Sequence, residues 1–147
     1  MLIDQDTLFS SNQNVAAAAA STNLIDLRGT TRRLGLGARP LYVAIQVTVA
    51  FDDSSNNSTL PIYLQTDDAA AFSTATNAQL LTTLPTNATV GTIRFCQIQS
   101  TAAEQYIRLY YDPQGGDFGN ARCSAWIVAD PQDWSAFPVG YSGPATA

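Results

Sequence analysis

The chain contains no histidine and no lysine, and Glu104 is its single glutamate. These absences remove the commonest general base and zinc ligand, the amine for a Schiff base, and the lysine of a phosphate-binding loop. The two cysteines, Cys96 and Cys123, lie too far apart in the sequence to form a metal-binding motif. We therefore expect a protein that is not an enzyme and that has no catalytic residues, no metal site and no cofactor.

Charge is also scarce, because charged residues make up only 13% of the 147 residues, about half the usual ~25%. All seven cations are arginines, and the net charge is −5. An acidic surface with few cations binds nucleic acid and anionic membranes poorly, because phosphate neutralisation supplies most of that affinity. We expect neither nucleic acid nor a membrane as a partner.

The near absence of glutamate and lysine also bears on the fold, since both are strong helix formers on solvated surfaces. Threonine, valine, isoleucine and tyrosine, which favour strands, are plentiful. Apolar residues alternate with other residues over 41–51, 59–65, 105–111 and 123–128, and more weakly over 23–27, 79–84 and 92–98. Seven or eight strands at this spacing predict an all-β sandwich, jelly roll or barrel. In the strand at 41–51, Val43, Ile45, Val47 and Val49 are expected to point inward.

The chain is predicted to have three parts. Residues 1–20 lack strand periodicity, and their alanine run is too short for an isolated helix. We interpret them as an N-terminal arm. Residues 21–130 are predicted to form the β-sandwich domain. Residues 131–147, which are rich in proline, glycine and aromatics, are predicted to form a C-terminal tail. The N-terminal residues have no basic region of the kind that opens a secretory signal. We expect synthesis in the host cytoplasm and both cysteines as small buried residues, with a disulfide between them as the alternative.

Turn residues give three local expectations. The segment 112–117, with a proline and two glycines, is predicted to join two strands as a long hairpin. Pro61 places its strand at a sheet edge, or places a bulge at its start. The pairs Asp52/Asp53 and Asp67/Asp68 belong to solvated loops on the simplest interpretation, while a calcium site stays a minor alternative.

Alternation also places some of the large aromatic side chains on outward faces of the strands. On a sheet face, tyrosine and tryptophan stack on sugars or fill a protein interface, where arginine is enriched as well. Ordinary packing between neighbouring strands explains about half of them. The aromatics considered are Tyr42, Tyr63, Tyr106, Tyr110, Trp126 and Trp134.

Five segments, in matching order, are similar to a known family. They are MLIDQDTLFSSNQNV…STNLIDL, GLGARPLYVAIQVTVAF, LPIYLQTDDAAAFST, EQYIRLYYDP and SAWIVADPQ, which together span about residues 1–132. In these segments the chain resembles the capsid cement, or decoration, proteins of tailed bacteriophages, typified by that of a Bordetella phage. The stretch Thr31-Arg32-Arg33 and the aromatic tail after Gln132 depart from the family pattern.

The resemblance implies a jelly-roll-like β-sandwich with extended arms on the outer face of an icosahedral shell. There the protein would bind the major capsid protein, bridge neighbouring subunits and reinforce the shell. Neighbouring copies of the chain are further expected partners, with a dimer favoured over a trimer. A carbohydrate-binding, lectin-like jelly roll remains the alternative function. The expected interface residues lie mainly in the termini: Leu2, Ile3, Leu8, Phe9, Arg32, Arg33, Trp134, Phe137 and Tyr141.

Overall fold

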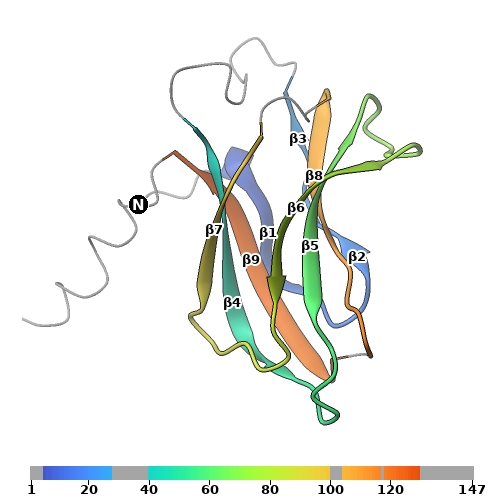
Figure 1. Cartoon of the computed structure of the whole chain (residues 1–147). Coiled ribbons are helices and arrows are strands. Elements are labelled where there is room, and N and C mark those ends of the chain that lie inside the picture. The colour runs from blue at the N-terminus through green and yellow to red at the C-terminus, as the bar shows by residue number, and fades with distance from the viewer. Residues whose placement is uncertain (1–4, 28–39, 100–103, 117, 130–147) are drawn as a thin grey trace, which may run out of the picture.

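The computed structural model describes residues 5–27, 40–99, 104–116 and 118–129. Within these residues the chain is all-β, and its strands form two facing layers (Figure 1). A short 3-10 helix, η1 (Gln5–Thr7), comes first. The strands are β1 (Leu8–Asn14), β2 (Ala19–Ala20), β3 (Ile25–Asp26), β4 (Tyr42–Asp52), β5 (Leu60–Asp67), β6 (Thr76–Leu84), β7 (Ile93–Gln97), β8 (Tyr106–Tyr111) and β9 (Asn120–Val128).

The strand order is that of a jelly roll. One sheet runs β1-β9-β4-β7, and the other runs β2-β8-β5-β6 with β3 also paired to β8. The first strand of the domain pairs with the last, and each later pair joins the next strand from either end, until two strands pair near the middle. These antiparallel pairs are β1·β9, β2/β3·β8, β4·β7 and β5·β6. This is one long hairpin rolled up into two sheets, and the pairs β4·β9 and β5·β8 complete them. The sequence-based expectation of a jelly-roll-like sandwich is confirmed.

The strands β2 and β3 share one edge of the five-stranded sheet. Ala20 pairs with Tyr110, and further along β8 Ile25 pairs with Ile107. Between them the Ser21 amide donates to the Leu109 carbonyl oxygen at 2.8 Å. The Ser21 hydroxyl donates to the Asn23 carbonyl oxygen at 2.7 Å and accepts from the Leu109 amide at 3.0 Å, where the regular pairing is interrupted. One interrupted strand therefore covers the edge of β8.

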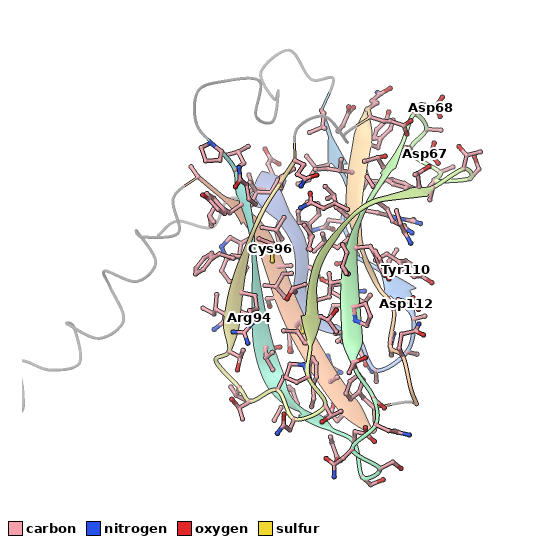
Figure 2. All side chains as sticks on the ribbon, viewed as in Figure 1. Asp67, Asp68, Arg94, Cys96, Tyr110 and Asp112 are labelled. Atoms are coloured by element: carbon pink, nitrogen blue, oxygen red, sulfur yellow. The ribbon has the colours of Figure 1, made fainter. Side chains whose placement is uncertain are left out.

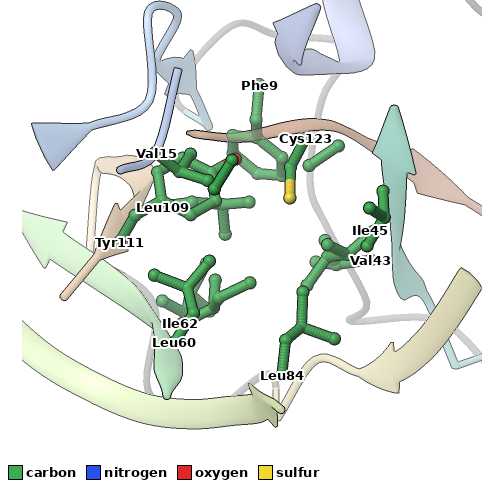
Figure 3. Packing of buried hydrophobic residues seen from close by; sticks show 14 of the residues in the cluster. Phe9, Val15, Val43, Ile45, Leu60, Ile62, Leu84, Leu109, Tyr111 and Cys123 are labelled. Carbon is green, nitrogen blue, oxygen red and sulfur yellow. The ribbon is translucent and has the colours of Figure 1, made fainter. Parts of the chain in front are cut away.

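The hydrophobic core fills the space between the sheets (Figure 3). Val43, Ile45 and Val47 of β4 are at most 1% exposed, as predicted. Val49 is only half-buried, because the pairing of β4 with β9 shifts register between Val47 and Val49. That bulge ends the simple alternation that the sequence suggested.

The strand that contains Pro61 is not at an edge, since β5 lies between β6 and β8. Pro61 is its second residue, and the pairing with β6 shifts register between Ile62 and Tyr63. The predicted edge position is therefore wrong, whereas the predicted bulge near the start of the strand is present.

The prediction that 112–117 forms a hairpin is also wrong. The strands that this segment connects, β8 and β9, belong to different sheets, so the segment crosses from one layer to the other. It is held instead by the neighbouring crossing between β4 and β5, where Thr59 and Gln114 exchange backbone hydrogen bonds of 2.8 Å. Gly115 has a φ of +88°, and a Cβ there would lie 2.1 Å from the Asn57 carbonyl oxygen. Composition marks a turn but not the sheet to which the next strand belongs.

The predicted N-terminal arm over residues 1–20 needs the largest correction. Residues 8–14 form β1, an edge strand of the four-stranded sheet, and Ala19–Ala20 form β2. Two register shifts between β1 and β9 break the alternation that would have marked this strand in the sequence. The sandwich therefore begins at about residue 8, while the predicted tail over 131–147 lies outside the described residues.

Candidate docking surface

Two of the predicted interface residues can be located in the structure. Phe9 is 0% exposed and belongs to the main core, so its prediction as a docking residue is wrong. Its ring stabilises the sandwich by about 1.5–3 kcal/mol through burial alone. Leu8, its neighbour, lies on the opposite side of β1 and is half-buried. The others lie outside the described residues: Leu2, Ile3, Arg32, Arg33, Trp134, Phe137 and Tyr141.

Leu8 belongs to a small apolar cluster on the outer face of the four-stranded sheet, which we call the Trp126 cluster. The strand register aligns Leu8 of β1, Trp126 of β9, Ala44 of β4 and Phe95 of β7 in one row across all four strands. Because directly opposed residues point to the same face, this row lies on the side away from the core. Tyr42 and Val128 occupy the adjacent row and complete the cluster.

The outer face of the five-stranded sheet carries a different surface, which we call the tyrosine face. Tyr63 of β5 pairs with Leu80 of β6 on one side and with Tyr110 of β8 on the other. Leu80 is 53% exposed, and both tyrosines are partly exposed. Figure 2 labels Tyr110 on the side of this sheet that faces away from the other layer. The tyrosine face comprises Tyr63, Leu80, Tyr106, Arg108 and Tyr110.

Arg108 is held in a fixed position within the tyrosine face. Its Nε donates to the Gln65 Oε1 at 2.8 Å, and the Gln65 Nε2 donates to the Asn77 Oδ1 at 2.8 Å. The guanidinium carbon also lies 4.1 Å from the centre of the Phe72 ring, a cation–π contact. Partial burial lowers the pKa of Arg108, although a guanidinium stays charged at neutral pH. A preorganised arginine among tyrosines has the composition of a protein interface, because arginine and tyrosine dominate binding hot spots.

The carboxylates of two aspartates in the acidic pairs accept hydrogen bonds from nearby backbone amides. The Asp53 carboxylate accepts hydrogen bonds from the amides of Ser55, Asn57 and Ser58 at 2.6–3.0 Å. The Asp67 carboxylate accepts from the amides of Ala69 and Thr74 at 3.0 and 2.9 Å. These bonds favour the charged form and lower the pKa of both carboxyls. Asp53 lies in a loop, as predicted, whereas the solvated-loop prediction is wrong for Asp67, which is the last residue of β5 and is 0% exposed. No group of three potential metal ligands occurs in the described part of the chain.

The cysteines are free thiols in the structure. Both flank β4, where Cys96 pairs with Val43 and Cys123 with Val47. Burial raises the pKa of Cys96, and it raises the pKa of Cys123 to about 12. Thiols that stay protonated are poor nucleophiles and poor metal ligands, so both act here as small packing residues.

Alternation in the sequence predicted part of the tyrosine face, because Tyr63, Tyr106 and Tyr110 were candidates for outward positions. Alternation within one strand also places Arg108 on the same face as Tyr106 and Tyr110. It did not identify Leu80, because the place of Leu80 beside Tyr63 depends on the strand register. Trp126 does point outward, as alternation suggested, yet it is only 2% exposed. The described residues include no helix long and apolar enough to cross a membrane.

Comparison of the sequence with known proteins identifies a family to which the chain belongs. A search of curated proteins finds no match to the sequence. A family model, Bbp16, matches residues 9–127, from the first core residue of β1 to the penultimate residue of β9. Bbp16 is a family of Bordetella phage proteins, in agreement with the resemblance seen in the sequence. Because the match covers nearly the whole sandwich, this chain belongs to the Bbp16 family.

Proposed function

We propose that the protein is a structural cement protein that binds the outer surface of an icosahedral phage shell. There it stabilises contacts between major capsid proteins. The match to a phage protein family over residues 9–127 is the observation that carries the proposal. The all-β sandwich and the absence of histidine and lysine from the sequence agree with a structural rather than a catalytic role.

The tyrosine face is the surface that we assign to shell binding. It is wide, because Leu80, Tyr63 and Tyr110 come from three neighbouring strands. Its polar atoms are already arranged, since Gln65 fixes the Arg108 side chain before any partner arrives. A side chain that is ordered in the free protein loses less entropy on binding than a mobile one, which favours affinity.

The partners that follow are the major capsid protein and neighbouring copies of this chain, with a dimer favoured over a trimer. The place of action is the exterior of the virion. Neither nucleic acid nor membrane is a partner in this proposal, because the net charge is −5 and lysine is absent.

The test compares shells that carry the protein with shells from which it has been removed. A ligand that binds only the assembled shell stabilises that state by mass action. Complete shells should therefore withstand higher temperature and greater force than depleted ones, and adding purified protein back should restore the difference. Equal stability of complete and depleted shells contradicts the proposal.

Variants of the tyrosine face test the assigned surface. Tyr63→Ser and Tyr110→Ser should each reduce the affinity for depleted shells by about thirtyfold or more, the loss typical of a truncated interface anchor. The matched control is Val90→Ser, which changes another exposed apolar residue, 64% exposed, outside the tyrosine face. If both tyrosine variants bind shells like the wild type, the docking surface is not the tyrosine face, even if the cement role holds.

A carbohydrate-binding function is the second candidate, and the pairing of Tyr63 with Tyr110 favours it. Two neighbouring aromatic side chains on an open sheet face can stack on successive sugar rings, and the Arg108 and Gln65 side chains beside them can bind hydroxyl groups. A glycan array separates the two functions. Glycan binding that Tyr63→Ser abolishes, together with unchanged shell stability, favours the lectin-like role.

A further inference from the structure

Arg108 lies in the middle of the tyrosine face. On β8 it stands between Tyr106 and Tyr110, and every second side chain of a strand points to the same side of the sheet. Across the sheet Arg108 pairs with Gln65 of β5, which pairs in turn with Asn77 of β6. Arg108 is the one charged member of the tyrosine face, so a partner that covers this surface must accommodate its charge.

Two contacts hold the guanidinium group of Arg108. Its Nε donates to the Gln65 Oε1 at 2.8 Å, and its carbon lies 4.1 Å from the centre of the Phe72 ring. Phe72 is 7% exposed and has a φ of +51°, a left-handed conformation that is rare for a bulky residue. The Asp67 carboxylate fixes this turn, because it accepts from two backbone amides, one before and one after Phe72. The turn therefore keeps the ring against Arg108.

These contacts leave the two terminal nitrogens of Arg108 for a partner. Within the part of the chain that the structure describes, neither Nη1 nor Nη2 donates a hydrogen bond or forms an ion pair. The charge of Asp67 acts on Arg108, but the oxygens of Asp67 accept from the backbone. The edge formed by Nη1 and Nη2 matches the two oxygens of a carboxylate, which it can bind through parallel hydrogen bonds.

We propose that Arg108 is the specificity-determining residue of the tyrosine face and that it binds a carboxylate side chain of the major capsid protein through both terminal nitrogens. This inference rests on the proposed function and adds the chemistry of the partner. Because Gln65 and Phe72 already hold the guanidinium, binding costs little side-chain entropy.

The neighbouring charges restrict the partner further. Asp26 of β3 and Asp67 of β5 pair with Tyr106 from its two sides, so two acidic residues occupy the row next to Arg108. They repel a continuous polyanion such as nucleic acid. A protein surface with one carboxylate among neutral or basic groups matches this charge pattern.

The affinity of the full-length protein for depleted shells tests the inference. At about 0.1 M salt, Arg108→Gln should bind about thirtyfold more weakly than the wild type, and the difference should shrink at about 1 M salt, which screens charge pairs. The matched control is Arg94→Gln, which removes the same charge from an exposed arginine of the other sheet and should bind like the wild type (Figure 2). Amidating the surface carboxylates of the shells with a carbodiimide and ethanolamine should reduce the wild type to the affinity of Arg108→Gln.

The outcomes separate this inference from the proposed function. If the wild type binds shells and Arg108→Gln binds as well as Arg94→Gln, only the inference is overturned. If the wild type does not bind depleted shells, the proposed function fails and the inference fails with it. A weaker Arg108→Gln with the salt dependence of the wild type shows a packing role, which overturns the carboxylate. So does an acidic glycan that the wild type binds and Arg108→Gln does not, when amidated shells are bound normally.

A second variant keeps the test decisive if circular dichroism shows that Arg108→Gln does not fold. Arg108→Lys retains the long side chain and the charge but lacks the planar pair of terminal nitrogens. It should bind shells about tenfold more weakly than the wild type. Binding equal to that of the wild type overturns the inference.

Discussion

Replacing Phe9 with alanine separates a core strand from a docking arm at the N-terminus. Phe9 is 0% exposed and sits in the main core, where Figure 3 shows it with Cys123 and Tyr111. Truncating a buried phenylalanine costs about 3–5 kcal/mol, since the cavity adds to the lost transfer free energy. Domains of this kind are stable by about 5–15 kcal/mol in total. Phe9→Ala should therefore remove a large share of the free energy of unfolding.

The expected change is large enough for simple assays. For a chain of about this size, each kcal/mol lowers Tm by about 2–4 °C, so Phe9→Ala should lower it by about 6–20 °C. Urea unfolding should show a lower midpoint with an unchanged slope, because the surface exposed on unfolding is the same. The measurement is thermal and urea unfolding of the isolated protein, followed by circular dichroism.

Leu80→Ala is the matched control, because Leu80 is an apolar residue that is 53% exposed. It should change the free energy of unfolding by no more than about 0.5 kcal/mol. If Phe9→Ala instead melted like the wild type and lost occupancy on shells, Phe9 would be an external anchor. The assignment of β1 to the sandwich would then be wrong.

Three further changes test other parts of the fold. Tyr111→Phe should cost about 1–3 kcal/mol in urea unfolding, because it leaves the buried Ser10 hydroxyl without its partner in the other sheet, and adding Ser10→Ala should recover part of that loss. Gly115→Ala should lower Tm, because its Cβ would clash with a backbone oxygen at a φ of +88°; a Tm equal to the wild type would contradict the contact between the two crossing loops. The pKa of Asp67 lies below its ordinary 3.8, so its charge stabilises the fold above that pH and the contribution is lost as pH falls through the lowered value. Asp67→Asn should thus lower Tm at neutral pH and make Tm fall less steeply as the pH drops. If the variant shows the same dependence of Tm on acid pH as the wild type, protonation of Asp67 does not cause the loss of stability in acid.

The sequence by itself determined the fold class and most of the strands. Strict alternation marked the strand at 41–51, because a sheet with one buried face needs an apolar side chain at every second position. The absence of histidine and lysine predicted a structural rather than a catalytic role. Alternation also pointed to the outward tyrosines, although it gave no information on which of them would become neighbours.

Only the tertiary structure decided which strands pair and which surfaces result. The bulges in β1 interrupt its alternation, and the sequence therefore predicted that Phe9 belongs to an arm. The pairing of β1 with β9 places Phe9 in the core. The loop at 112–117 reads as a turn in either topology, and its crossing between layers follows from long-range pairing. Leu80 and Tyr63 are distant in sequence and adjacent on the tyrosine face because β5 and β6 pair in one register. Local patterns fix the face on which a side chain lies, but register and sheet order, which arise from contacts between distant segments, determine its neighbours.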